Sequence, residues 1–266
     1  MREAGLVVAD IHQALRRACR PGITTKELDR VSADTIAAHG ATSNFLGYFG
    51  YPATVCISVN DTVVHGIPDD YQLQRGDLVS FDCGAYVMRN GRQWHGDAAF
   101  SMIVGGDEHA SQARRQLNAV TEESMWAAIA ALPRARRVNA VGRAVEQVVA
   151  KRSADFGWEA GIIEDFTGHG IGTAMHQEPD VFNFEVRGIT PKLKPGMVIC
   201  IEPMLTAGTI ETVTLPDEWT VKTTDHSDAA HWEHTIAILE EGISVLTAPD
   251  FGEAGLAPYG VTPIHL

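Results

Sequence analysis

Four acidic residues of this 266-residue chain lie in segments that otherwise read as apolar strands. The four are Asp82 in LVSFDCG, Asp97 in GDAAFSMIV, Glu202 in MVICIEPM and Glu233 in WEHTIAIL. A carboxylate is costly to bury among apolar side chains unless it is paired or bound to a metal ion. One such acid is more often a capping or salt-bridged residue, but four in matching surroundings are harder to explain in that way.

The number of these acids suggests what they bind. Four carboxylates brought together would repel one another, and some would stay protonated. Two divalent cations would balance the four negative charges, so the pattern predicts a site for two metal ions. Paired metals with bridging carboxylates suit hydrolysis, because they lower the pKa of a shared water molecule and stabilise the tetrahedral intermediate.

One histidine is a candidate fifth ligand. His169 lies in FTGHGIG between Gly168 and Gly170, and these glycines let the backbone bring the imidazole ring close to other groups. Imidazole binds Zn, Co, Fe and Mn, whereas carboxylates suit Mn and harder ions. One histidine with four carboxylates disfavours a structural zinc site, which prefers cysteine and histidine.

For two further histidines and an aromatic loop, the sequence is compatible with either an ordinary structural role or a role beside the metal site. His65 in NDTVVHGIP and His176, seven residues after His169, can be ordinary loop histidines. Near a metal site they can instead hydrogen-bond a substrate amide or a developing oxyanion. The segment FLGYFGYP (45–52) can be core packing or the lining of an apolar pocket beside the metals.

A weak internal repeat indicates how the acids come together. QRGDLVSFDCG (74–84) resembles KPGMVICIEPM (194–204), since in each a glycine precedes a short apolar strand that ends in an acid. A second strand, opened by another acid, follows in both halves, and helical segments precede both strand pairs. We therefore predict an α+β domain whose two halves are related by a pseudo-two-fold axis.

The helices and strands expected around these motifs follow from periodicity and turn residues. Thr24 and Glu27 have the spacing of a helix capping box. A turn is expected at Asn60–Asp61, and the tail from about Pro249 onward is the only stretch that looks weakly packed. The expected helices cover residues 1–18, about 24–39, 109–132 and 138–157, and the expected strands lie within 54–67, 78–87 and 98–105.

Composition narrows the class of protein. Hydrophobic residues make up 45% of the chain, enough for one substantial core. Acids outnumber bases 34 to 21, so we expect no direct nucleic-acid binding. The four cysteines form no CxxC pair, so neither a zinc knuckle nor a disulfide framework is indicated, and their sparse use fits a reducing compartment. No signal peptide and no apolar run of about 20 residues is evident, so we expect a cytoplasmic protein and no membrane association.

Six motifs in order resemble those of type I methionine aminopeptidases, which are pita-bread metallopeptidases. The motifs are NDTVVHGIP, SFDCG, WHGDAAF, FTGHGIG, IEPML and WEHT, and the resemblance extends from Met1 to about Leu246. As an ordered set they are highly specific. The resemblance implies a single catalytic domain over residues 1–266, with pseudo-two-fold related halves and a curved, mainly antiparallel sheet covered by helices.

The resemblance also implies an activity and a role for each site residue. The activity is removal of the N-terminal methionine from nascent proteins and peptides with a small second residue, with two divalent ions (Co, Mn, Fe or Zn). Glu202 would assist proton transfer, His176 would stabilise the tetrahedral intermediate, and His65 would contact the scissile amide. The implied metal ligands are Asp82, Asp97, His169, Glu202 and Glu233, of which Asp97 and Glu233 would bridge both ions. The implied substrate-binding residues are Tyr48, Tyr51, Cys56, His65, His176 and Trp219.

Partners and departures from the family pattern complete these expectations. The partners would be methionyl peptides and nascent chains, with docking to the ribosome left open, and the protein would be a monomer. The segment between Asp82 and Asp97 is a few residues longer than is usual in the family, and we expect a larger hairpin with its turn at Arg89–Asn90–Gly91. Met175 stands where a phenylalanine is common, just before His176.

Two alternatives share the same motifs. Xaa-Pro aminopeptidases and prolidases resemble this chain in the five ligands, but they usually carry an additional N-terminal domain for which this chain leaves no room. A non-catalytic binding protein of the same fold would typically have lost ligands, and all five are present. NDTVVHGIP and the tyrosine-containing loop favour methionine over proline specificity.

Overall fold

The chain forms five α-helices and several antiparallel sheets, and a computed structural model describes residues 1–266. The helices are α1 (Arg2–Ala18), α2 (Thr25–Ala38), α3 (Gln112–Ala131), α4 (Ala140–Phe156) and α5 (Glu253–Leu256). The strands are β1 (Thr42–Ser43), β2 (Val55–Val59), β3 (Thr62–Val64), β4 (Leu78–Arg89), β5 (Arg92–Ile103), β6 (Gly161–Ile162), β7 (Gly168–Gly170), β8 (Gln177–Val181), β9 (Val198–Ile201), β10 (Met204–Thr206), β11 (Thr212–Thr214), β12 (Val221–Thr223), β13 (Ala229–His231), β14 (His234–Ile238) and β15 (Ile243–Val245). Short 3-10 turns cover Tyr48–Gly50, Asp107–His109, Leu132–Arg134 and Ala257–Tyr259.

The two N-terminal helices form as the sequence predicts. The apolar residues of α1 recur every three or four positions, so one stripe of the helix is buried. At the start of α2 the capping box is complete. Thr24 Oγ1 accepts the Glu27 N–H at 3.1 Å, and the Glu27 carboxylate accepts the Thr24 N–H at 2.8 Å.

The longest hairpin of the chain joins β4 to β5. Its turn lies at Asn90 and Gly91, whose φ values of 52° and 71° match a two-residue turn of type I′. The expected turn is confirmed, but both strands are longer than predicted. Asp97 consequently lies in the middle of β5 instead of opening it, because residues 92–96 before it also pair with β4.

The two halves of the repeat occupy equivalent places. β4 pairs with β5 in the first half and β9 with β14 in the second, both antiparallel. The halves are joined where the Glu233 N–H donates to the Ala99 carbonyl at 2.9 Å and the Ala99 N–H donates back at 3.3 Å. The pseudo-two-fold α+β arrangement is therefore confirmed. It places acids from both halves beside one seam.

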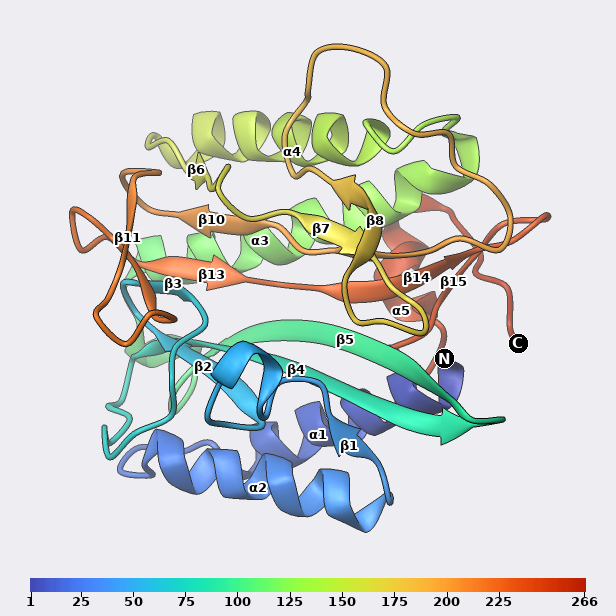
Figure 1. Cartoon of the computed structure of the whole chain (residues 1–266). Helices are drawn as coiled ribbons and strands as arrows, with labels where there is room; N and C mark the ends of the chain where they lie inside the picture. Colours follow the sequence, from blue (N-terminus) through green and yellow to red (C-terminus); the bar gives the residue numbers. More distant parts are fainter.

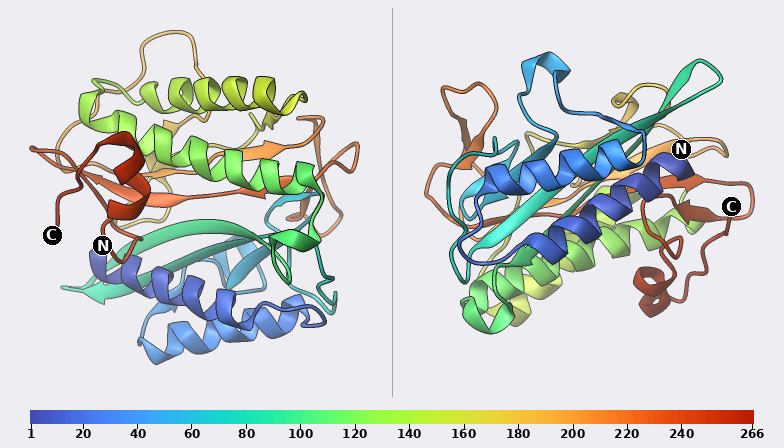
Figure 2. Two further views of the ribbon diagram at one scale, coloured as in Figure 1. Left: turned by 180° about the vertical axis from the view of Figure 1, so that it is seen from behind. Right: turned by 90° about the horizontal axis from the view of Figure 1, so that it is seen from below.

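The helices cover one side of the strands. Seen from behind, α3 and α4 lie over the second half, and α1 and α2 lie along the outer side of the first half (Figure 2). The opposite side carries the loop between β1 and β2 and the loops around β8 (Figure 1).

One continuous hydrophobic core runs through both halves and includes part of the tail. Leu256 of α5 is fully buried, and the Tyr259 hydroxyl donates to the Glu123 carbonyl at 3.0 Å. The expectation of a weakly packed tail was wrong for this part, because Gly255 lets the backbone lie flat against the Trp126 ring. None of the helices combines the length and apolarity needed to cross a membrane.

Candidate active site

The four acids predicted from the strands converge at the seam between the halves. Asp82 and Asp97 come from paired strands β4 and β5, whereas Glu202 follows β9 and Glu233 precedes β14. Carboxylate oxygens of Asp82, Asp97 and Glu233 lie within 4.8 Å of one another. Nε2 of His169 lies 3.5 Å from Oε1 of Glu202, which brings the fifth predicted ligand to the same place.

The hydrogen-bonding capacity of these four carboxylates is only partly met within the protein. Each of the four has one buried oxygen with no hydrogen-bond partner. Burial raises the pKa of Asp82 to about 7. Burial, together with neighbouring carboxylates, raises the pKa values of Asp97, Glu202 and Glu233 well above their usual range. Orphaned buried oxygens on clustered acids fit bound cations, which would supply both the missing partners and the missing charge.

His169 reaches the carboxylates because its two neighbours have no side chain. A Cβ on Gly168 would lie 2.3 Å from the Cys200 carbonyl oxygen, and a Cβ on Gly170 would lie 2.2 Å from that of Glu178. The glycines are thus needed for the close packing of β7 between β8 and β9. Burial lowers the pKa of His169 to about 4, so the imidazole is neutral and able to bind a metal ion.

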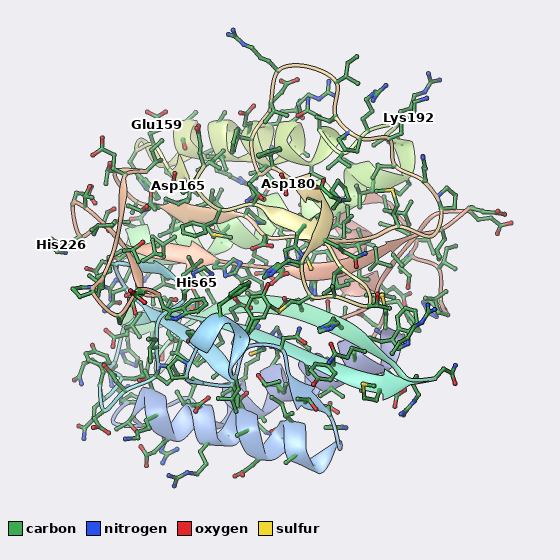
Figure 3. The ribbon with its side chains drawn as sticks, viewed as in Figure 1. His65, Glu159, Asp165, Asp180, Lys192 and His226 are labelled. Atoms are coloured by element: carbon green, nitrogen blue, oxygen red, sulfur yellow. The ribbon has the colours of Figure 1, made fainter.

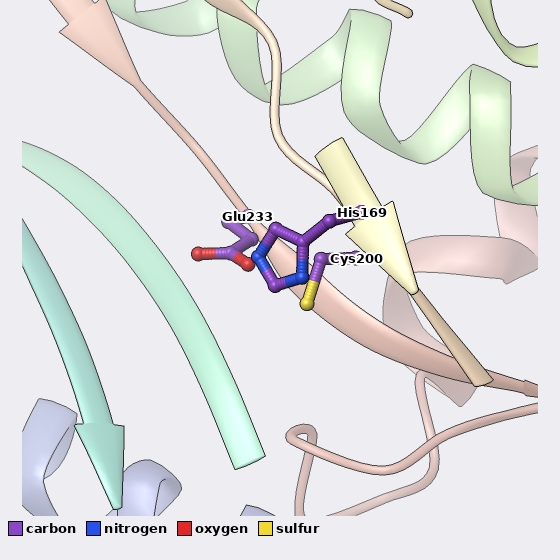
Figure 4. A group of neighbouring side chains, drawn as sticks. All are labelled: His169, Cys200 and Glu233. Carbon is purple, nitrogen blue, oxygen red and sulfur yellow. The ribbon is translucent and has the colours of Figure 1, made fainter. Parts of the chain in front are cut away.

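Cys200 is a further residue of this cluster that sequence reasoning missed. The side chains of His169, Cys200 and Glu233 point toward one another from separate segments (Figure 4). Burial raises the pKa of the Cys200 thiol well above its usual range, and the Glu233 and Asp97 carboxylates add to this rise. The thiol therefore stays protonated in the metal-free site. Strand alternation could have found it, because it lies two residues before Glu202 on the same face.

The two other predicted histidines lie beside the carboxylates. His65 lies at the height where the two halves meet, left of centre in Figure 3, with its ring 5.4 Å from that of Phe166 and 6.0 Å from that of Trp219. Its φ of 59° is rare for a residue with a side chain, and such strain is often found at functional sites. His176 packs edge-on against His169 at 4.3 Å and is partly exposed at the mouth of the site.

An apolar wall adjoins the carboxylates. A small hydrophobic cluster, separate from the main core, contains Phe45, Tyr51, Ala53, Cys56 and Met175, with Tyr48, Ile67 and Trp219 packed against it. The Tyr51 hydroxyl donates to the Gly66 carbonyl at 2.9 Å, which fixes the ring in this wall. The aromatic loop therefore lines the site and is not part of the main core.

All eleven predicted site residues line one cavity of about 240 Å³, together with Phe45, Phe49 and Met175. Phe45 and Phe49 belong to the segment 45–52, so the second of the two readings of that segment, a pocket lining, is the one that the structure supports. Sequence reasoning also missed His231, whose buried Nε2 has no hydrogen-bond partner and lies 3.8 Å from Oε2 of Glu202. The alternation of side chains along a strand could have predicted this position, since His231 stands two residues before Glu233. Burial lowers the pKa of His231 to about 3.

Four clustered carboxylates and one neutral imidazole beside an apolar cavity define the class of a metal-dependent hydrolase. The model of metallopeptidase family M24 matches residues 1–240, and the chain belongs to this family. Methionine aminopeptidase 1 of Mycobacterium tuberculosis is 46% identical over 248 residues, which cover 93% of this chain and 91% of that protein.

Solved structures agree with this assignment. The crystal structure of methionine aminopeptidase from Thermotoga maritima superposes with a TM-score of 0.85 at 33% identity, covering 93% of this chain and 94% of that one. The prolidase from Pyrococcus furiosus has a TM-score of 0.67 at 20% identity and is covered to 62% of its length. The prolidase thus shares the fold, whereas the likeness to methionine aminopeptidases extends to the sequence.

Proposed function

We propose that this protein removes the N-terminal methionine from peptides and nascent proteins whose second residue is small. The observation that carries the proposal is the single cavity in which the five-residue donor set meets an apolar wall. The relatives at 38–46% identity are named methionine aminopeptidases, which supports the same activity here.

Two divalent ions fit the donor set. Asp82, Asp97, His169, Glu202 and Glu233 would hold them. When bound, such ions lower the pKa of water and polarise the scissile carbonyl. The mixture of one imidazole and four carboxylates is compatible with Co, Mn, Fe or Zn, so we propose no single metal.

The remaining polar groups of the cavity have complementary tasks. The Glu202 carboxylate accepts a proton from the attacking water and passes it to the leaving amine. His176 donates a hydrogen bond to the oxyanion that develops on the scissile carbonyl. His65 contacts the scissile amide, and burial supports a neutral ring there by lowering its pKa to about 4. These roles suit general acid–base catalysis at neutral pH.

The apolar wall would bind the methionine side chain. Tyr48, Tyr51, Cys56, His65 and Trp219 surround the space beside the carboxylates, with Met175 closing it. An unbranched thioether adapts to irregular apolar surroundings and gains from contact with aromatic rings. We infer that methionine is held by shape and by these rings, because the wall offers no charged partner other than the metal site.

The whole chain would act as one catalytic domain, as a monomer in the cytoplasm. Its substrates would be methionyl peptides and emerging nascent chains. Docking to the ribosome would place the enzyme near such chains. Sedimentation of the purified protein, alone and with ribosomes, measures both points.

The test begins with removal of the metals. Mn, Co, Fe and Zn are then added back one at a time, and release of the first residue is measured from Met-Ala-Ser and from Ala-Pro-Ser. Metal-dependent release of methionine alone is the expected result. Preference for Ala-Pro-Ser would move the protein to the proline-specific branch, and full activity in verified metal-free protein would refute the two-metal proposal.

Matched variants separate metal binding from general damage. Asp97→Asn removes one of the five proposed ligands and should abolish activity with every metal. Asp34→Asn changes an exposed acid of α2 in the same way and should leave activity unchanged. Equal loss in both variants would point to instability instead of metal binding.

A further inference from the structure

One hydrogen bond joins the two halves of the chain across the mouth of the cavity. The Tyr48 hydroxyl oxygen lies 2.8 Å from Nδ1 of His176, a residue 128 positions away. Tyr48 comes from the loop between β1 and β2, and His176 comes directly before β8. Their rings are 5.5 Å apart and tilted, so the contact is made edge to edge and not by stacking.

The loop that carries Tyr48 is a tight turn held by its own backbone. Gly47 N–H donates to the Tyr51 carbonyl at 2.8 Å, and Tyr51 N–H donates to the Tyr48 carbonyl at 2.9 Å. Gly47 and Phe49 have φ values of 84° and 45°, in the left-handed region. These bonds fix the backbone that carries Tyr48, so they fix the position from which its side chain extends toward His176.

The hydroxyl is able to act as the donor in this pair. Burial, with the nearby Asp97 carboxylate, raises the pKa of Tyr48 above its usual range, so its O–H is retained at neutral pH. A neutral imidazole carries its hydrogen on one of its two nitrogens and accepts at the other. In His176, the hydrogen bond made by Nδ1 decides which ring nitrogen carries the hydrogen: if Nδ1 accepts, the hydrogen is on Nε2.

We propose that Tyr48 is a positioning residue for His176: its hydroxyl donates to Nδ1, which places the hydrogen on Nε2 and aims that N–H into the cavity. The two nitrogens point in different directions in the ring plane. With Nδ1 turned toward Tyr48, Nε2 is the nitrogen left to donate to an oxyanion. This inference rests on the proposed function of His176, and it gives Tyr48 a task beyond forming part of the methionine pocket.

The tautomer is measured directly by ¹⁵N NMR of histidine-labelled protein, metal-free and loaded with diamagnetic zinc. The His176 signals are assigned from their loss in His176→Ala. We expect the Nε2–H tautomer in the unchanged protein and a mixture of tautomers in Tyr48→Phe. The Nδ1–H tautomer in the unchanged protein, or identical His176 signals in Tyr48→Phe, would overturn the proposal.

A matched control is Tyr71→Phe. Tyr71 is also a surface tyrosine with one hydroxyl hydrogen bond, to Asp77 at 3.0 Å, but it lies outside the cavity. Its replacement should leave both the His176 signals and the peptidase activity unchanged. A change of the His176 signals in this variant would show that they report general perturbation and would remove the support for Tyr48.

Kinetics provide the second readout. Loss of the hydroxyl should lower kcat of Tyr48→Phe by about 5- to 20-fold while KM stays within about twofold, since the ring still fills the pocket. In a His176→Ala background the same change should have no further effect on kcat, because the two residues act as one unit. A pure pocket residue would instead raise KM in both backgrounds.

The two readouts separate this inference from the proposed function. If no methionyl peptide is cleaved with any metal, the proposed function fails, while the NMR result still decides the hydrogen bond. If methionine is released but Tyr48→Phe changes neither kcat nor the tautomer, the function stands and the positioning role is refuted.

Discussion

Replacing Asp82 with asparagine should stabilise the metal-free protein at neutral and alkaline pH. Asp82 lies among buried carboxylates with an unpartnered oxygen, and burial raises its pKa from 3.8 to about 7. In the unfolded chain the pKa returns to about 3.9. Above this value the unfolded state binds fewer protons than the folded state, so the folded state loses stability as the pH rises.

The size of this effect follows from the two pKa values. The raised pKa of Asp82 lowers the free energy of unfolding by about 0.5 kcal/mol at pH 4 and by about 4 kcal/mol at pH 8. Above pH 8 this loss grows little further, because Asp82 is then ionised in both states. For a chain of this size, 1 kcal/mol changes Tm by about 2–4 °C. Asp82→Asn should therefore raise Tm by about 8–16 °C at pH 8 and by only about 1–2 °C at pH 4.

The quantity to compare is the difference in Tm between Asp82→Asn and the unchanged protein at each pH, and not the pH profile of either protein alone. Several buried histidines have lowered pKa values, and they contribute stability that is lost as the pH falls below about 6.5. This contribution opposes that of Asp82 but is common to both proteins, so it cancels in the comparison. These histidines are His12, His65, His95, His169, His231 and His234.

The assay is thermal unfolding followed by circular dichroism, in verified metal-free protein at several pH values between 4 and 8. Asp34→Asn is the control, since this exposed acid of α2 lies outside the cluster. Added zinc should reverse the order and favour the unchanged protein, because Asp82→Asn lacks a ligand. Equal Tm values at pH 8, or a gap that does not vary with pH, would refute the reasoning about the buried carboxylates.

Other consequences can be tested singly. Glu202→Gln or His176→Ala should lower turnover by about 100-fold or more with the far-UV circular dichroism unchanged, and normal turnover in either would count against its role. Met-Gly peptides should be cleaved far faster than Met-Lys peptides, and equal rates would exclude a preference for small second residues. Gly142→Ala should destabilise the protein by about 1–3 kcal/mol in urea unfolding, because its Cβ would lie 2.1 Å from the Phe184 carbonyl oxygen.

Local sequence determined the candidate ligand residues and most of the helices and strands. An acid in an apolar strand is recognisable without any tertiary information. The alternation of side chains along the strand also indicates which neighbouring residues lie on the same face of the sheet as the acid. The capping box at Thr24 and the turn at Asn90–Gly91 depend only on neighbouring residues, and both are present. The internal repeat then related Asp82 to Glu202 and predicted two halves related by a pseudo-two-fold axis.

Contacts between distant segments were decided only by tertiary packing. The bond from Tyr48 to His176, the approach of His231 to Glu202 and the packing of Gly255 on Trp126 each join residues far apart in the chain. Periodicity specifies a face of a strand or helix but not which loop will lie over it. That choice depends on how the two halves close around the seam, because the close packing of both halves sets the distance between every such pair.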